Sequence, residues 1–441
     1  MFDLIVKGGT CFTPSGRMRA DVGIKNGAIA ALGDLGKESA REILDAGGLC
    51  VLPGLIDTQV HFRDPGAPHK EDFPHGTAAA ALGGVTGVFD MPNTHPSTTT
   101  KDAFANKMRN AEGRSFANYA FYVGATGDQT DLGELERLPG CCGVKIFMGS
   151  STGSLLVEDD AALERVLRSI TRRAAVHAED EPRLKERKHL AVEAAHPSAH
   201  PIWRDEETAF KATRRIVSLA KKLGKRLHVL HVTTAEELQF LSEHKDFVTV
   251  ECLPQHLVFT DADYETLGTR LQMNPPIRAA RHQEALWKAM QEGVVDILGS
   301  DHAPHTLEEK AQKYPATPSG MPGVQTIVPV MLDCVNRGKT TLERVVDLMA
   351  SSPQRIFGLV RKGRLTVGYD ADLTLADMEA SFTFKDENMR SKCGWTPFHG
   401  RACKGAPTHT IIGGTFAMRE GRLQEIPLGK PFAFLETIRT A

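Results

Sequence analysis

The stretch PGLIDTQVHFRDPG at residues 53–66 decides the fold, because a short apolar run in it leads directly into polar residues. Short apolar runs bounded by glycine and proline are typical of buried strands. The run at residues 54–61 ends on His61, and the same arrangement of an apolar run with a polar end recurs along the chain. We therefore predict that residues 54–61 are the first of a series of similar strands.

Seven more runs of this kind follow, with helical stretches such as residues 208–224 and 282–293 between them. The expected strands are residues 54–61, 84–91, 118–124, 143–147, 173–177, 226–231, 247–252 and 295–301. Alternating strands and helices indicate βαβ units and a parallel sheet. Eight such units fit a closed barrel better than an open, doubly wound sheet. The predicted fold of residues 53–354 is a (β/α)8 TIM barrel in an α/β protein.

Both ends of the chain differ from this middle part. Residues 1–52 and 355–441 alternate apolar and polar residues between glycine and aspartate turns. This pattern is typical of half-buried strands. We therefore predict one small β-sandwich domain, with its N-terminal part at 1–52 and its C-terminal part at 355–441.

Charge and hydropathy narrow the partners and the location of this 441-residue chain. Its 53 Lys and Arg nearly balance its 55 Asp and Glu, so electrostatic binding of nucleic acid or of an anionic membrane is not expected. A small molecule is the expected partner. The beginning MFDLIVKGG does not resemble a secretory signal, and no apolar stretch reaches the length of a membrane span, so we expect a cytoplasmic protein.

The cysteine pattern argues against a disulfide framework. The eight cysteines form no CxxC pair, and Cys141 and Cys142 are neighbours. Such a pattern favours reduced, mostly buried thiols over a disulfide scaffold or a cysteine-rich zinc site.

Five polar residues lie at the end, or just past the end, of different predicted strands: His61, Lys145, His177, His231 and Asp301. In a barrel these strand ends meet at one face, which is where barrel enzymes build their active sites. A single histidine at a strand end is more often a structural residue than a ligand. Five such residues at one face are much harder to attribute to chance, so we expect a functional site.

These residue types indicate a metal centre. Imidazole nitrogens from His61, His177 and His231 suit zinc, and Asp301 offers a hard oxygen ligand or a base. An ammonium group cannot bind a cation, so Lys145 is either a buried, ion-paired residue or is carboxylated on its amine and thereby becomes an anionic ligand. The local sequence leaves both readings open. His228, three residues before His231, should point to the opposite face of its strand and is interpreted as structural.

Several motifs together resemble the amidohydrolase superfamily, specifically its cyclic-amidase branch of dihydroorotases, allantoinases and hydantoinases. The resemblance covers nearly the whole chain. It is carried by PGLIDTQVHFRDPG at 53–66, KED at 70–72, GTAAAALGGVT at 76–86, GSDHAPH at 299–305, and the C-terminal stretches GRLTVGYDADL and WTPFHGRACKG.

The resemblance implies roles for the residues at the strand ends. Lys145 would be a carboxylated bridging lysine that holds one metal together with His177 and His231, while His61 and Asp301 would belong to a second metal position. The implied cofactor is zinc, with one or two ions per chain. The family also implies a homo-oligomer, either a dimer or a tetramer.

Gln59 is the one departure from the family pattern. The first strand of the family normally carries HxH, whereas this chain has QVH at residues 59–61. An amide oxygen is a far weaker zinc ligand than imidazole, so the metal position served by this pair should be depleted or absent. Either the enzyme works with one well-held metal, or Gln59 marks a degenerate site; the other chemical positions favour retained activity.

Three further residues favour the dihydroorotases within the branch: Arg63, Asn93 and His305. Arg63 lies two residues beyond His61 and can present a bidentate fork to a carboxylate. In dihydroorotases, residues at these places bind the carboxylate of the ring. Allantoinases usually place the Asn one residue later, and hydantoinases lack the Arg. Each residue alone has a structural reading, as a salt bridge, a turn cap and a loop hydrogen bond respectively.

The expected function is therefore the reversible hydrolysis of dihydroorotate to N-carbamoyl-L-aspartate. As a hypothesis, a bound cation polarises the ring carbonyl and acidifies the attacking water. Asp301 takes the proton of the water and delivers it to the departing amide nitrogen. Two alternatives stay open, an allantoinase or other cyclic ureide or imide hydrolase, and an inactive structural partner of another pyrimidine enzyme.

The stretch at residues 306–326 follows the last predicted strand and mixes charges with proline and glycine. It could cover the site during the reaction, or it could be a solvated surface connection.

Overall fold

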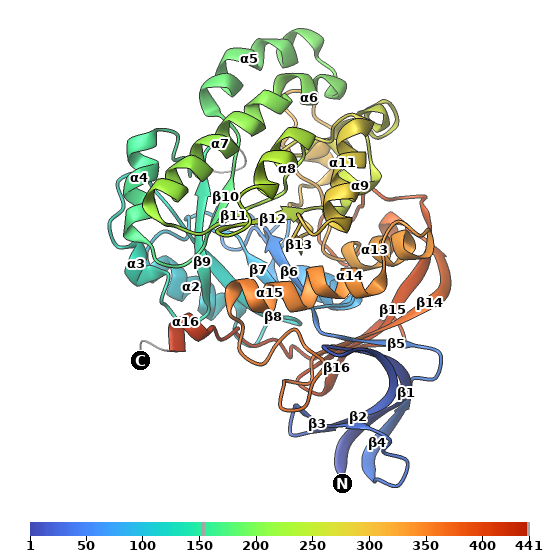
Figure 1. Ribbon diagram of the computed structural model, residues 1–441. Coiled ribbons are helices and arrows are strands. Elements are labelled where there is room, and N and C mark those ends of the chain that lie inside the picture. Colours follow the sequence, from blue (N-terminus) through green and yellow to red (C-terminus); the bar gives the residue numbers. More distant parts are fainter. Residues whose placement is uncertain (151–154, 439–441) are drawn as a thin grey trace.

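The computed structural model describes residues 1–150 and 155–438 and shows a barrel with a separate sheet beside it (Figure 1). The eight expected strands of the barrel are all present and pair in parallel, in the order of the chain. They are β6 (Leu55–Val60), β7 (Val85–Asp90), β8 (Asn118–Gly124), β9 (Cys141–Phe147), β10 (Ala174–His177), β11 (Leu227–Val229), β12 (Val248–Cys252) and β13 (Ile297–Leu298). The His61 N–H donates to the His302 carbonyl at 2.7 Å and links β6 to the segment after β13. The predicted (β/α)8 barrel is therefore confirmed.

Two barrel strands are much shorter than expected at their C-terminal ends, and the backbone explains why. β11 ends at Val229 and β13 at Leu298, although the sequence predicts strands to residues 231 and 301. His231 and Asp301 have φ values of 36° and 45°, in the left-handed region where a strand cannot continue. Both strands therefore end just before a residue at which the chain turns.

Helices surround the barrel (Figure 1). The longest, α7, covers the helix predicted at residues 208–224 except for its last residue. Asp205 caps it by accepting from the Thr208 N–H, and Gly224 ends it with φ 64°. The helices are α1 (Phe73–Leu82), α2 (Lys101–Ala111), α3 (Leu132–Leu135), α4 (Asp160–Ser169), α5 (Glu181–Ala194), α6 (His200–Trp203), α7 (Glu206–Leu223), α8 (Ala235–Ser242), α9 (Pro254–Val258), α10 (Tyr264–Leu267), α11 (Ala280–Gln291), α12 (Leu307–Lys310), α13 (Ile327–Asn336), α14 (Leu342–Val346), α15 (Ser352–Phe357) and α16 (Leu435–Ile438).

Aromatic side chains from the C-terminal part of the chain fill the barrel interior. Phe357, Phe432 and Phe434 pack edge-on against Phe89 of β7, with ring centroids 5.1–5.9 Å apart. The same buried cluster contains inward residues such as Cys142, Ala175 and Leu230, which precede the predicted site residues along their strands. The interior is thus a packed core beneath the strand ends, as in other barrels of this kind.

Both termini contribute to the second domain, which lies at the lower right of Figure 1. Its nine strands form one sheet, in which strands from the two ends of the chain join where β14 pairs with β5 in antiparallel fashion. The strands are β1 (Phe2–Thr13), β2 (Gly16–Lys25), β3 (Ala28–Gly33), β4 (Ala40–Asp45), β5 (Cys50–Pro53), β14 (Leu373–Thr383), β15 (Ala402–Ile412), β16 (Thr415–Arg419) and β17 (Arg422–Leu423). The prediction of a small β domain built from both termini is confirmed.

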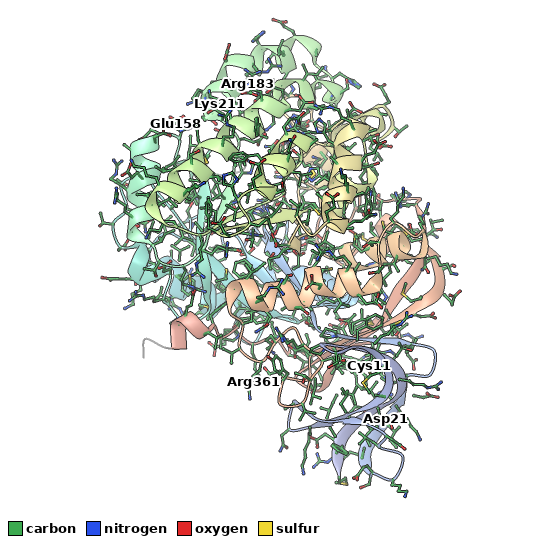
Figure 2. All side chains as sticks on the ribbon, viewed as in Figure 1. Cys11, Asp21, Glu158, Arg183, Lys211 and Arg361 are labelled. Atoms are coloured by element: carbon green, nitrogen blue, oxygen red, sulfur yellow. The ribbon has the colours of Figure 1, made fainter. Side chains whose placement is uncertain are left out.

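The cysteines are free thiols, of which seven are buried and Cys50 is partly exposed. Cys11 lies inside the terminal domain close to Asp21 (Figure 2). Its thiol donates to the Ala20 carbonyl, and burial raises its pKa to about 11. No helix within residues 1–150 and 155–438 is long and apolar enough to cross a membrane.

Candidate metal and substrate site

The structure brings the predicted metal-binding residues together around one small cavity. His61, Lys145, His177, His231 and Asp301 all line it. The cavity measures about 20 Å³, which is room for about one water molecule. The other lining residues are Gln59, Arg63, Asn93, Phe147, Asn274, Ala303, Ser319 and Gly320.

His177 and His231 lie in contact with each other at the wall of this cavity. His177 Nδ1 lies 3.1 Å from His231 Nε2, and the two ring planes are nearly perpendicular. Burial lowers the pKa of both rings, so both are neutral near pH 7 and offer lone pairs. Two neutral imidazoles with converging nitrogens are a suitable pair of ligands for zinc.

Lys145 stands beside this pair on β9 and is 1% exposed. Its Nζ lies 4.5 Å from the centre of the Phe147 ring. Burial lowers the pKa of the Lys145 amine to about 7, although Asp301 and Glu251 attract the charged form. A large fraction of the amine is therefore neutral near pH 7, and the neutral form is the one that can react with carbon dioxide.

Glu179 and Arg204 hold His177 in place from outside the cavity. His177 Nε2 lies 2.9 Å from a Glu179 oxygen, and Arg204 Nε donates to the other oxygen at 3.0 Å. Burial alone would raise the pKa of Glu179, but Arg204 and His177 hold it well below its usual range. A carboxylate behind a histidine in this way fixes the ring orientation of a metal ligand.

The donor set fits a metal only if Lys145 is modified. Among residues 1–150 and 155–438, no three His, Cys, Asp or Glu side chains are grouped so that they could hold a metal ion. His177 and His231 supply two neutral donors, and the site still needs a third donor that is anionic. A carboxylated Lys145 would supply that donor at the same cavity, so the residues present fit a zinc ion held by this trio.

On the opposite side of the cavity, Asp301 is bound by side chains of the first barrel strand. Gln59 Nε2 donates to Asp301 Oδ1 at 3.0 Å, and His61 Nε2 lies 3.1 Å from the same oxygen. His61 Nδ1 is 2.7 Å from Asn93 Oδ1. Asn93 is therefore joined to Asp301 through a single imidazole ring.

Arg63 lies at the edge of the cavity and is largely buried. Its Nε donates to the Pro304 carbonyl at 3.3 Å, and a terminal nitrogen is 3.4 Å from His305 Nε2. Burial lowers the pKa of Arg63 to about 10, and burial and the nearby cations lower that of His305, whose ring is therefore neutral. The guanidinium thus keeps its charge while its closest partners, a carbonyl and a neutral ring, carry none.

His305 supports Arg63 but does not itself line the cavity. Its Nε2 also lies 3.1 Å from the Ser319 carbonyl, and its Nδ1 lies 3.2 Å from Lys70 Nζ. The structure therefore brings Arg63 and Asn93 to the cavity and places His305 directly behind Arg63.

Three of the site residues have a left-handed backbone: Arg63 (φ 55°), His231 (φ 36°) and Asp301 (φ 45°). Such conformations are costly for residues other than glycine and concentrate at functional sites. The expectation that His228 points to the opposite face from His231 is wrong. Because the alternation of a strand stops at the turn of His231, His228 also faces the barrel interior, where its ring packs against Phe357 and its Nε2 is 3.5 Å from Glu251.

Sequence reasoning missed several residues of the cavity wall. Asn274 precedes two prolines in the stretch MNPP, which is a loop signal, and its Oδ1 is 2.9 Å from His200 Nε2. Phe147 ends β9 two residues after Lys145, so strand alternation could have placed it on the same face. Ser319 and Gly320 belong to the segment 306–326, so part of this segment forms the wall of the site.

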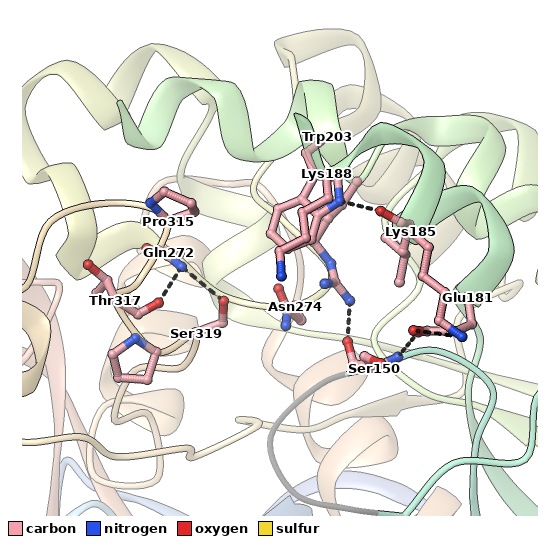
Figure 3. A pocket seen from close by; sticks show the side chains of 13 residues that line it. Ser150, Glu181, Lys185, Lys188, Trp203, Gln272, Asn274, Pro315, Thr317 and Ser319 are labelled. Carbon is pink, nitrogen blue, oxygen red and sulfur yellow. Dashed lines mark hydrogen bonds and ion pairs between the residues drawn. The ribbon is translucent and has the colours of Figure 1, made fainter. Parts of the chain in front are cut away.

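A larger cavity of about 530 Å³ adjoins the site and shares Asn274 and Ser319 with it (Figure 3). Lys185 and Lys188 of α5 line it, together with Trp203 and Arg204. Arg204 donates to the Ser150 carbonyl, and Gln272 donates to the Thr317 carbonyl and to Ser319 Oγ. A ring that is too large for the inner space can therefore lie partly in this outer cavity.

Comparison with known proteins agrees with the barrel fold. The model of the amidohydrolase family matches residues 50–417. A dihydroorotase of Halobacterium salinarum is 38% identical over 372 residues, which are 83% of this chain and 85% of that protein. An L-hydantoinase of Paenarthrobacter aurescens is 33% identical in an alignment of 446 positions that covers 96% of each chain. The solved L-hydantoinase (dihydropyrimidinase) of Arthrobacter aurescens superposes with a TM-score of 0.94 at 31% identity, covering 98% of this chain and 99% of that one.

Proposed function

The chain is a member of the amidohydrolase family, and on that basis we propose that it is a dihydroorotase. It is a hydrolase that acts on a cyclic amide. The reaction is the reversible hydrolysis of dihydroorotate to N-carbamoyl-L-aspartate, in de novo pyrimidine biosynthesis. Several relatives at 32–38% identity carry the name dihydroorotase. The observation that carries the choice of substrate is Arg63, a buried guanidinium at the edge of the site whose hydrogen-bond partners are neutral, because a guanidinium in this place suits an anionic ligand.

Arg63 binds the ring carboxylate of the substrate in this proposal. A guanidinium presents two parallel N–H donors that match a carboxylate, and such pairs are strong where water is excluded. Asn93 also lines the cavity and offers its amide to the same end of the ring. His305 holds the Arg63 fork at 3.4 Å from behind.

Asp301 is the proposed catalytic residue. It accepts the proton of the attacking water and returns it to the amide nitrogen as the ring opens. When bound by carboxylated Lys145, His177 and His231, a zinc ion would supply Lewis-acid polarisation of the ring carbonyl. Gln59 and His61 hold the Asp301 carboxylate towards the cavity through its Oδ1. In the reverse direction the same residues close N-carbamoyl-L-aspartate into the ring.

The cofactor, assembly and location are part of the proposal. We take the cofactor to be zinc, retained by a carboxylated Lys145, and we take the protein to be a cytoplasmic homo-oligomer, a dimer or a tetramer. The inner cavity has room for only part of a ring, and the rest of the substrate can lie in the adjoining cavity.

A second candidate function is hydrolysis of an uncharged ring of the hydantoin or dihydropyrimidine type. It is favoured by the TM-score of 0.94 to an L-hydantoinase. An allantoinase activity and an inactive structural role are the remaining alternatives, and Gln59 is the feature that favours inactivity.

One assay separates these functions. The purified chain is tested for ring opening of dihydroorotate, allantoin, dihydrouracil and hydantoin, and zinc is measured in the same sample. We expect turnover of dihydroorotate well above that of the uncharged rings, its loss with a chelator, and its recovery with zinc and bicarbonate. Preference for an uncharged ring would support the second candidate, and no turnover by zinc-loaded protein would refute the proposal.

A further inference from the structure

We propose that Gln59 replaces a second cation, so that this enzyme holds a single metal ion at Lys145, His177 and His231. The inference rests on the proposed function and goes further, because it assigns the metal number and makes Gln59 a positioning residue for Asp301.

The first argument is the orientation of the Gln59 amide. Its Nε2 donates to Asp301 Oδ1 at 3.0 Å, so its Oε1 points away from the carboxylate. If the amide turned over, its oxygen would face the anionic Asp301 oxygen and would be repelled. A glutamine that ligates a cation next to Asp301 must present that oxygen, so the arrangement of this amide favours a hydrogen bond to Asp301 over a cation between the two side chains.

The second argument is the state of the Asp301 oxygen. Oδ1 is contacted by both Gln59 Nε2 and His61 Nε2, at 3.0 and 3.1 Å. Hydrogen bonds to a carboxylate stabilise its charge, and a cation at this place would have to displace the amide N–H group. The Gln59 dipole thus supplies, without a cation, part of the charge stabilisation that a second metal would give.

The third argument is the burial of this contact. Gln59 is 1% exposed and Asp301 is 6% exposed. A hydrogen bond to a carboxylate is stronger where water is excluded, so the Gln59 amide holds the Asp301 carboxylate firmly.

The test counts metal ions in three proteins. After loading with zinc and bicarbonate and removal of free metal, wild type should retain about one zinc per chain. Gln59→His adds an imidazole beside His61 and Asp301 and should raise the count to about two. Gln255→His is the matched control. Gln255 is also a buried glutamine near the site with an unpaired Oε1, but its amide donates to the Ser300 carbonyl, so its count should stay at one.

Manganese loading gives a second readout that does not depend on activity. The electron paramagnetic resonance spectrum of wild type should be that of isolated ions, and that of Gln59→His should show coupled pairs. Gln59→Leu removes the amide without adding a metal ligand, so this variant should fold and keep one ion. Two ions per chain in wild type, or an unchanged count in folded Gln59→His, would overturn the inference.

The outcome is separate from that of the proposed function. Wild type that opens dihydroorotate while holding two ions refutes only the single-metal inference. Wild type that holds one ion but does not open dihydroorotate refutes only the proposed function.

Discussion

Replacement of Arg63 by Met should remove recognition of the ring carboxylate and leave the rest of the site in place. Methionine keeps the apolar stem and loses the guanidinium. The Arg63 side chain is buried with a residue exposure of 6%, so solvent does not screen its charge. A bidentate pair with a carboxylate has two charge-assisted hydrogen bonds, each worth about 1.5–3 kcal/mol.

The summed loss is about 3–6 kcal/mol, which corresponds to a fall in kcat/KM for dihydroorotate of about 10²–10⁴-fold. Arg63→Lys keeps the charge but not the two parallel donors, so its kcat/KM for dihydroorotate should lie between those of Arg63→Met and wild type. Weak turnover of an uncharged ring should change by less than about tenfold, because such a ring has no carboxylate for Arg63 to bind.

The stability of the free protein provides an internal control. Burial lowers the pKa of Arg63 to about 10 despite the attraction of Asp301, Asp90 and Glu309, so the folded state disfavours this charge. Arg63→Met should therefore unfold at the same temperature as wild type or at a higher one. Steady-state assays on both rings and thermal unfolding test these expectations. A fall in turnover that is equal for both rings, or a clear loss of stability, would refute the reasoning.

Three further predictions concern other parts of the site and its support. Asp301→Asn should lower kcat by about 10²–10⁴-fold with KM within a few-fold, as measured by steady-state kinetics, and a mainly KM effect would contradict its role as base. Glu179→Gln should weaken zinc binding by about 10–100-fold in competition with a chelator, and unchanged affinity would show that His177 needs no support. Burial alone would raise the pKa of Asp205, but bonds from Arg183 and Thr208 lower it to about 2. Because this folded value lies below the ordinary 3.8, the stabilisation is present above pH 3.8 and is lost as the pH falls towards 2. Asp205→Asn should therefore lower the free energy of unfolding in urea by about 2 kcal/mol at pH 7, and the difference from wild type should vanish as the pH falls to about 2. A difference in unfolding free energy that does not change with pH would contradict this mechanism.

The barrel could be predicted from the sequence because each of its strands is a short apolar run that ends on a recognisable residue. Lys145 and His177 were located correctly for the same reason, since each lies inside its strand on the inward-facing side. The convergence of His61, Lys145 and His177 then follows from barrel geometry alone.

The directions of His228 and His231 could not be predicted in this way. Alternation along a strand assumes extended backbone, and His231 has φ 36°. Nothing in a single sequence reveals a left-handed histidine. The Pro304 carbonyl as a partner of Arg63 was equally hidden, because backbone groups that meet only through long-range contacts leave no signal in the sequence.

The most direct test of the account is the position of the metal in a crystal grown with zinc and bicarbonate, located by anomalous scattering at the zinc edge. We expect one strong peak within bonding distance of His177 Nδ1, His231 Nε2 and an oxygen of the carboxylate group carried by Lys145. A peak elsewhere in the molecule, or none at these three residues in protein that opens dihydroorotate, would contradict it.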